Sequence, residues 1–130
     1  MRTIKFRGKC ADDGMWRYGD LLHENGLLWI NDNGLHCTVD ENTVGQFTGW
    51  SRRGKFELYE GDVIGFDDWA FSERERKKMR HHVGVIEWST DYGKWMIKCN
   101  DGFFEGNDVA DPQLLGNIFD NPELKDLYEC

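Results

Sequence analysis

Carboxylates gather in the middle of this chain, at a spacing that could serve metal binding or proton transfer. Glu60 and Asp62 lie on either side of Gly61, and Asp67 and Asp68 follow five residues further on. Such a group could hold a divalent cation in a hydrolase or act as general acid and base. Alternatively, Asp and Glu in a tight turn hydrogen-bond nearby backbone amides, and glycine supplies backbone freedom. We favour a structural turn formed by Tyr59, Glu60, Gly61 and Asp62, and predict no catalytic, metal-binding or cofactor-binding residue.

The histidines and cysteines lack the close spacing from which zinc sites are usually assembled, because no C-x-x-C or H-x₃₋₅-H pair occurs. His36 and Cys37 are neighbours, which on a strand would point their side chains to opposite faces. A Cys–His nucleophilic pair could assemble in space, but nothing local marks a thiol as activated. No phosphate-binding G-x-x-x-x-G-K-[ST] or G-x-G-x-x-G motif is present either. We therefore expect no enzyme. The singly scattered cysteines predict reduced thiols and no disulfide: Cys10, Cys37, Cys99 and Cys130.

Charge is unevenly distributed along the chain. The 130 residues carry a formal net charge of −8, which disfavours nucleic acid as the main partner. Between Glu73 and Arg80, however, five basic residues accompany two acidic ones, and the remainder of the chain has a net charge of −11. This basic segment consists of Arg74, Arg76, Lys77, Lys78 and Arg80. With Trp69 and Phe71 beside it, the segment could bind nucleic acid by charge and base stacking, bind a protein, or be a solvated helix.

Short strands separated by polar turns are the elements that must position these residues. Alternation in Thr3 to Arg7 predicts a half-buried strand with Ile4 and Phe6 on one face. Asn-Gly turns are predicted at His23 to Gly26 and Asn31 to Gly34, and a further polar turn is predicted at Ser51 to Gly54. The further predicted strands are Met15 to Leu22, Leu27 to Ile30, Leu35 to Val39, Val63 to Phe66, Val83 to Ser89, Lys94 to Cys99 and Phe103 to Glu105.

Two short helices complete the prediction. Ser72 and Glu75 fit a capping box for a helix within an insertion over 67–82, and Asn121 would cap a helix running from Pro122 to about Tyr128. The chain is long enough for one domain, with subdomains expected at 1–58 and 59–130. No stretch of about 18 apolar residues and no signal-peptide h-region is present, so we expect a cytoplasmic protein without a membrane partner.

The segment QFTGWSRRGKFELYEGDVI (46–64) closely resembles the central motif of the YopX family of phage and prophage proteins. IKFRGK (4–9), VIEWSTDYGKWMI (85–97) and LLGNIFDNPEL (114–124) resemble further family segments in the same order. The resemblance implies a mainly β, β-rich α+β fold of antiparallel strands with an SH3-like small barrel, and a phage protein that self-associates. No established activity, and hence no catalytic residue, is implied.

These observations favour a non-enzymatic, phage-encoded accessory protein that forms homo-oligomers and binds a host or phage protein. Aromatic side chains and arginine dominate interface energetics, so the candidate contacts are Trp50, Trp69 and Phe71, with the basic segment as orienting charge. The alternatives are nucleic-acid binding through residues 74–80 and a metal-dependent hydrolase built on the carboxylates.

Overall fold

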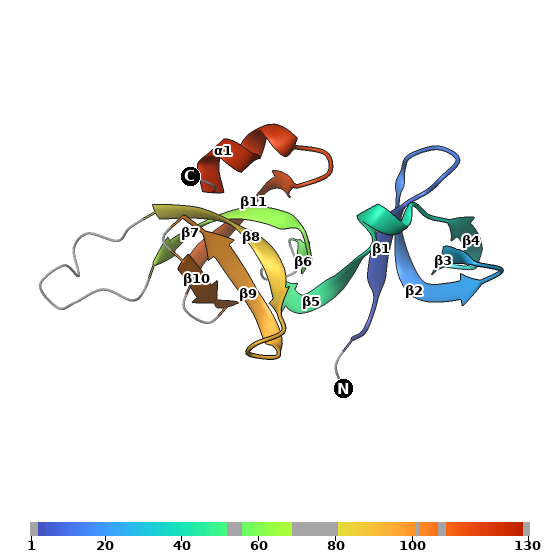
Figure 1. Cartoon of the computed structure of the whole chain (residues 1–130), viewed down its shortest axis with the longest axis horizontal. Coiled ribbons are helices and arrows are strands. Elements are labelled where there is room, and N and C mark those ends of the chain that lie inside the picture. The colour runs from blue at the N-terminus through green and yellow to red at the C-terminus, as the bar shows by residue number, and fades with distance from the viewer. Residues whose placement is uncertain (1–2, 52–55, 69–80, 101, 107–108, 129–130) are drawn as a thin grey trace, which may run out of the picture. The chain divides into compact units, whose positions relative to one another are not determined.

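The chain forms two compact units of antiparallel β-structure (Figure 1). The computed structural model describes residues 3–51, 56–68, 81–100, 102–106 and 109–128, with the backbone alone described at 68 and 109–111. Unit 1 comprises Met1–Ser51 and Glu57–Tyr59, and unit 2 comprises Arg52–Phe56 and Glu60–Cys130. The mainly β class predicted from the sequence is confirmed.

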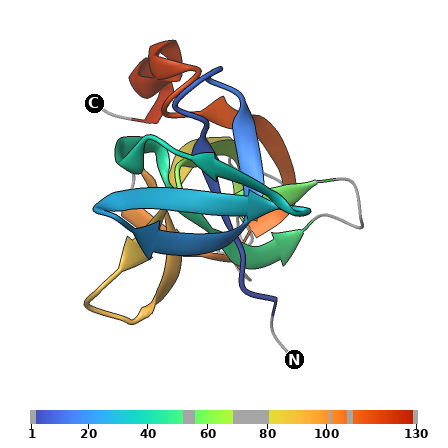
Figure 2. The ribbon, with the colours of Figure 1, turned by 90° about the vertical axis from the view of Figure 1, so that its right-hand side faces the viewer.

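Unit 1 is a six-stranded sheet in the order β4-β3-β2-β1-β5-β6 (Figure 2). Asn25-Gly26 joins β2 to β3, and Asn33-Gly34 joins β3 to β4. All four residues have φ between 51° and 93°, as two-residue type I′ hairpin turns require. Both predicted Asn-Gly hairpins are confirmed. The strands are β1 (Phe6–Lys9), β2 (Trp16–Glu24), β3 (Leu27–Asp32), β4 (Leu35–Thr38), β5 (Gly45–Ser51) and β6 (Glu57–Tyr59), with the 3₁₀ turn η1 (Glu41–Thr43) before β5.

The first strand differs from its prediction. It begins at Phe6 rather than Thr3, and Arg7 is buried whereas Ile4 is 55% exposed. The Arg7 guanidinium lies 4.6 Å from the ring centroid of Trp16 and 5.0 Å from that of Tyr59. Cation–π contacts with these two rings therefore stabilise the buried Arg7 charge. The alternation of polar and apolar residues in the sequence does not predict that burial.

The FTGW part of the central motif forms a β-bulge between β5 and β6. Phe47 pairs with Tyr59 and Ser51 with Glu57, so three residues on β5 oppose Leu58 alone. Gly49 takes φ 87° in the bulge. The Thr48 hydroxyl donates to the Leu58 carbonyl at 2.8 Å and accepts from the Trp50 N–H at 3.0 Å. Gly49 thus supplies the positive φ of the bulge, and the Thr48 hydroxyl supplies hydrogen bonds to two backbone groups there.

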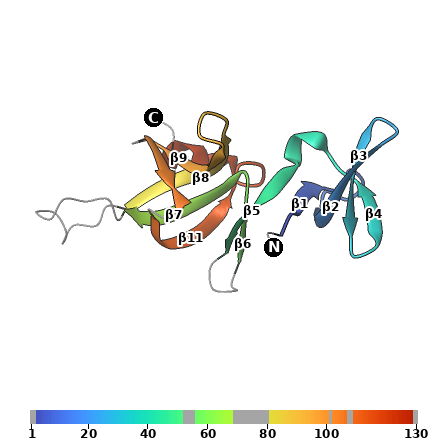
Figure 3. The ribbon, with the colours of Figure 1, turned by 90° about the horizontal axis from the view of Figure 1, so that it is seen from below.

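Unit 2 is a curved five-stranded sheet in the order β10-β9-β8-β7-β11 (Figure 3). One face carries the fully buried Ile64, Phe66, Ile86 and Ile97. On the other face, Val63 and Val85 pack with Tyr128 of the C-terminal helix α1. The elements are β7 (Asp62–Asp68), β8 (His81–Ser89), β9 (Lys94–Cys99), β10 (Gly102–Glu105), β11 (Val109–Asn117), η4 (Pro122–Leu124) and α1 (Lys125–Tyr128).

Strand β11 was missed by the sequence analysis, which left 109–117 without a strand. Pro112 lies inside it, where the register with β7 shifts between Ala110 and Gln113. Within the described sheet β11 is an edge strand. Proline lacks the N–H of a ladder hydrogen bond, so within sheets it occurs at edges and bulges, and this strand provides both.

Two helix predictions need correction. The helix after Pro122 exists as η4 and α1, but Asn121 makes no side-chain cap; its Oδ1 accepts from the Asn117 N–H at 3.2 Å. The predicted helical insertion over 67–82 is wrong at its ends, because Asp67–Asp68 and His81–His82 belong to β7 and β8. Residues 69–80, including the Ser72 capping box, lie outside the described residues. The SH3-like barrel remains a prediction.

Candidate functional site

The Glu60–Asp62 turn is held by backbone hydrogen bonds within unit 2. The Gly61 N–H donates to the Ile86 carbonyl at 2.9 Å, and its carbonyl accepts from the Ile118 N–H at 3.0 Å. Gly61 has φ 89°, and a Cβ there would lie 3.2 Å from the Phe119 ring. Asp62 is 1% exposed at the start of β7. The structural role of this turn stays a prediction, and these contacts support it.

The carboxylates do not gather as the metal hypothesis requires. Asp62 and Asp67 occupy opposite ends of β7, and five residues of strand span about 16 Å. Asp67 instead accepts from the His81 ring at 3.1 Å, between paired residues of β7 and β8. Among the residues that the structure describes, no three His, Cys, Asp or Glu side chains form a group that could hold a metal ion. The separation of Asp62 and Asp67 along β7 therefore argues against the alternative in which the four carboxylates hold one ion.

An aromatic pocket lies at the β8–β9 end of unit 2. Its volume is about 190 Å³, and Trp88 and Phe103 on its rim are 46% and 56% exposed. Glu87, Met96 and Phe103 come from the sheet face on which α1 packs, as the strand register shows. The lining residues, which define the aromatic pocket, are Glu87, Trp88, Ser89, Thr90, Asp91, Met96 and Phe103.

The turn between β8 and β9 fixes the end of the pocket. The Gly93 N–H donates to the Ser89 carbonyl at 2.8 Å, and the Tyr92 N–H donates to the Ser89 hydroxyl at 3.2 Å. Trp88 packs edge-to-face against the opposite Trp95, with ring centroids 5.1 Å apart. These contacts hold Trp88 within the β8–β9 hairpin, whereas Phe103 comes from β10.

A second hollow of about 640 Å³ lies on unit 1 and is mostly polar. Lys5 and Glu57 form an ion pair across part of its lining at 2.6 Å. Tyr18 is the large aromatic side chain in this lining, whereas the smaller aromatic pocket has two such rings and a methionine. Polar surface exceeds apolar surface in both hollows, so the aromatic pocket differs from the second hollow chiefly in its exposed aromatic residues.

Of the predicted partner-binding residues, Trp50 alone lies within the described part of the chain. Trp50 is half-buried in β5 of unit 1, within the bulge. The remaining candidates lie outside the described residues: Trp69, Phe71, Arg74, Arg76, Lys77, Lys78 and Arg80. Nucleic-acid binding through this segment stays an untested prediction. The aromatic pocket was missed, although the six tryptophans signalled a surplus of aromatic side chains.

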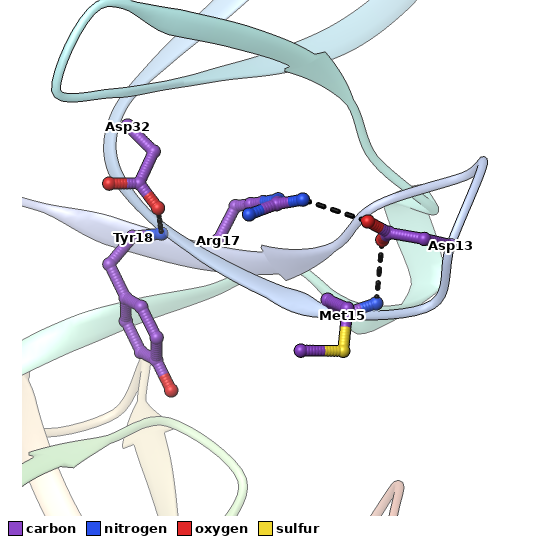
Figure 4. A network of polar contacts seen from close by, with 5 residues as sticks. All are labelled: Asp13, Met15, Arg17, Tyr18 and Asp32. Atoms are coloured by element: carbon purple, nitrogen blue, oxygen red, sulfur yellow. Dashed lines mark hydrogen bonds and ion pairs between the residues drawn. The ribbon is translucent and has the colours of Figure 1, made fainter.

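A polar cluster lies beside the end of β1 in unit 1 (Figure 4). Asp13 accepts from the Met15 N–H at 2.9 Å and from the Arg17 guanidinium at 2.8 Å. The Met15 hydrogen bond, with the Cys10 contact and the Arg17 charge, lowers the pKa of the Asp13 carboxyl. Burial and the neighbouring Cys10 thiol raise the pKa of Cys37, against the opposing effect of Arg17.

The architecture defines a mainly β protein with two antiparallel sheets and a short C-terminal helix. Residues 5–126 match the model of the family described as YopX protein, so the chain belongs to the YopX family. A search of curated proteins finds no match. Within the described part of the chain, no helix has the length and apolar character needed to cross a membrane.

Proposed function

We propose that this chain is a non-enzymatic, self-associating protein-binding module of phage origin that acts in the bacterial cytoplasm. The observation that carries the proposal is the aromatic pocket, which has the half-exposed Phe103 in its lining and the half-exposed Trp88 at the same end of the sheet. Large aromatic side chains placed on rigid elements are typical anchors of protein interfaces.

The chemistry of the pocket favours a partner that carries positive charge. Glu87 and Asp91 place two carboxylates in the same lining as Trp88 and Phe103. An arginine or lysine side chain can pair with such carboxylates and stack on the rings. The apolar stem of the same side chain covers the hydrophobic surface.

The chain itself supplies a segment with this chemistry. Residues 74–80 carry five basic side chains on a protein whose remaining net charge is −11. Charge complementarity of this kind selects partners and their orientation. We infer that the pocket of one copy receives the basic segment of a second copy. A host or phage protein with a similar basic segment would compete for the same pocket.

Self-association tests this proposal directly. Sedimentation velocity of the full chain over a range of concentrations and salt should show a monomer–oligomer equilibrium that weakens as salt rises. Glu87→Lys should raise the dissociation constant about tenfold or more, which corresponds to about 1.4 kcal/mol. Glu24→Lys changes the charge equally at an exposed site on unit 1 and should leave the equilibrium unchanged.

A charge-swap pair sharpens the test. Glu87→Lys mixed with a variant carrying Arg76→Glu and Lys77→Glu should form mixed oligomers better than either variant alone. The proposal is wrong if the parent chain stays monomeric at all concentrations. It is equally wrong if Glu24→Lys weakens assembly as much as Glu87→Lys does.

A further inference from the structure

Two cysteines that are far apart in the sequence lie side by side in unit 1. Cys10 follows β1 and forms an antiparallel bridge with Val39, and the adjacent Ala11 N–H donates to the Thr38 carbonyl at 2.8 Å. Cys37 lies on β4, two residues before Val39. Since alternate residues of a strand share a face, Cys10 and Cys37 are diagonal neighbours on one face.

The side chains of the two cysteines meet. The Cys10 thiol is near enough to Cys37 to raise the pKa of its thiol. Cys10 also contacts the Asp13 carboxylate and the Arg17 guanidinium. Cys10 is buried, whereas Cys37 is half-buried and therefore more accessible to a reagent. Cys99 differs from this pair, because its sulfur contacts the Gly102 carbonyl at 3.5 Å.

We propose that Cys10 and Cys37 are a reversible dithiol–disulfide pair that a hydroperoxide oxidises within unit 1. Cys37 reacts first because it is the more exposed, and its raised pKa makes the reaction faster as the pH rises. Its thiolate attacks one peroxide oxygen, the O–O bond breaks, and a sulfenic acid forms while one water leaves. The Cys10 sulfur then attacks the Cys37 sulfur; the S–O bond breaks and a second water leaves. Two thiol protons and one hydrogen peroxide thus become one disulfide and two waters, and the two electrons lost by sulfur reduce the peroxide.

The disulfide would tie the end of β1 to β4. These strands are separated by β2 and β3 in the sheet order, and the bridge at Cys10 and Val39 joins their ends. Diagonal neighbours are more widely spaced than the roughly 3.8 Å between the Cβ atoms of a disulfide, so closure needs a small shift of the backbone. Strand β4 can supply that shift, because it has four residues and is an edge strand of the described sheet. Oxidation would therefore join the end of β1 covalently to the edge strand β4.

Oxidation of the native full chain tests the pair. After treatment with hydrogen peroxide and alkylation of the remaining thiols, peptide mapping should find a Cys10–Cys37 link, with a mass loss of about 2 Da from two hydrogens. Dithiothreitol should reverse it. Cys99→Ser should form the link as the parent does, and Cys37→Ser should form no intrachain link. The oxidised parent should melt at a higher temperature than the reduced parent, and Cys37→Ser should show no such rise.

A second probe needs neither oxidation nor a variant of the buried Cys10. Phenylarsine oxide bridges two adjacent thiols, so the reduced parent should bind one equivalent about 100-fold or more tighter than Cys37→Ser does. Cys99→Ser should bind as the parent does. A link between another pair of cysteines, a predominance of intermolecular disulfides, or equal arsenical binding by the parent and Cys37→Ser would overturn the proposal.

Discussion

Gly84 in β8 has no room for a side chain, and adding a methyl group there should destabilise unit 2. A Cβ at this position would lie 2.6 Å from the Ile97 Cγ2 atom and 2.9 Å from the Lys98 carbonyl oxygen. Favourable carbon contacts need about 3.5 to 4.0 Å, so the overlap with Ile97 is about 1 Å. Ile97 is fully buried, and the Lys98 oxygen belongs to the backbone of β9, so neither atom can move freely.

Overpacking of a core costs about 1 to 3 kcal/mol, and alanine recovers about 0.4 to 1 kcal/mol by restricting the unfolded chain. An overlap of about 1 Å with buried and backbone atoms takes the upper end of that cost, so after the alanine gain we expect Gly84→Ala to lower the free energy of unfolding by about 2 kcal/mol. For a chain of this length, such a loss corresponds to a decrease in Tm of about 6 to 12 °C. Urea denaturation and thermal melts followed by tryptophan fluorescence would measure the effect.

Gly65 in the adjacent strand β7 is the matched control. A Cβ there would lie 3.3 Å from two atoms of the His81 ring, whose side chain is 66% exposed and can rotate away. Gly65→Ala should therefore change the stability by no more than about 1 kcal/mol in either direction. The steric argument fails if Gly84→Ala melts within 2 °C of the parent, an interval of roughly half a kcal/mol. It also fails if the two variants lose equal stability.

Three further predictions concern other parts of the fold. Asp62→Asn should lower the free energy of unfolding by about 1 to 3 kcal/mol, because the carboxylate is buried, and chemical denaturation would show it. Tyr128→Ala should cost about 2 to 4 kcal/mol by removing the ring that packs on the sheet of unit 2, with hydrogen exchange in α1 as the measurement. The raised pKa of Cys37 should place half-maximal alkylation at a higher pH than for an ordinary thiol, and Arg17→Gln should move it higher still, since the lost cation opposes that rise; a pH–rate profile with iodoacetamide decides both.

Local signals in the sequence were sufficient for much of the sheet structure. Asn-Gly pairs prefer positive φ, so the hairpins at Asn25-Gly26 and Asn33-Gly34 follow from two residues each. Strand β9 runs over Lys94–Cys99, as alternation and β-propensity predicted. The candidate site was harder to predict from the sequence, because the aromatic pocket combines a hairpin end with Phe103 on another strand. No local sequence pattern specifies that these two elements lie together.

By itself, the sequence determined the family, the mainly β class and the tight turns, because these depend on backbone preferences within a few residues. Only the tertiary structure decided that Pro112 lies within a strand, that Arg7 is buried between aromatic rings, and that Cys10 meets Cys37. Each of these depends on strand order and register, which bring together segments far apart in the chain. A one-residue change of register moves every side chain to the opposite face, so such contacts are properties of the assembled sheet.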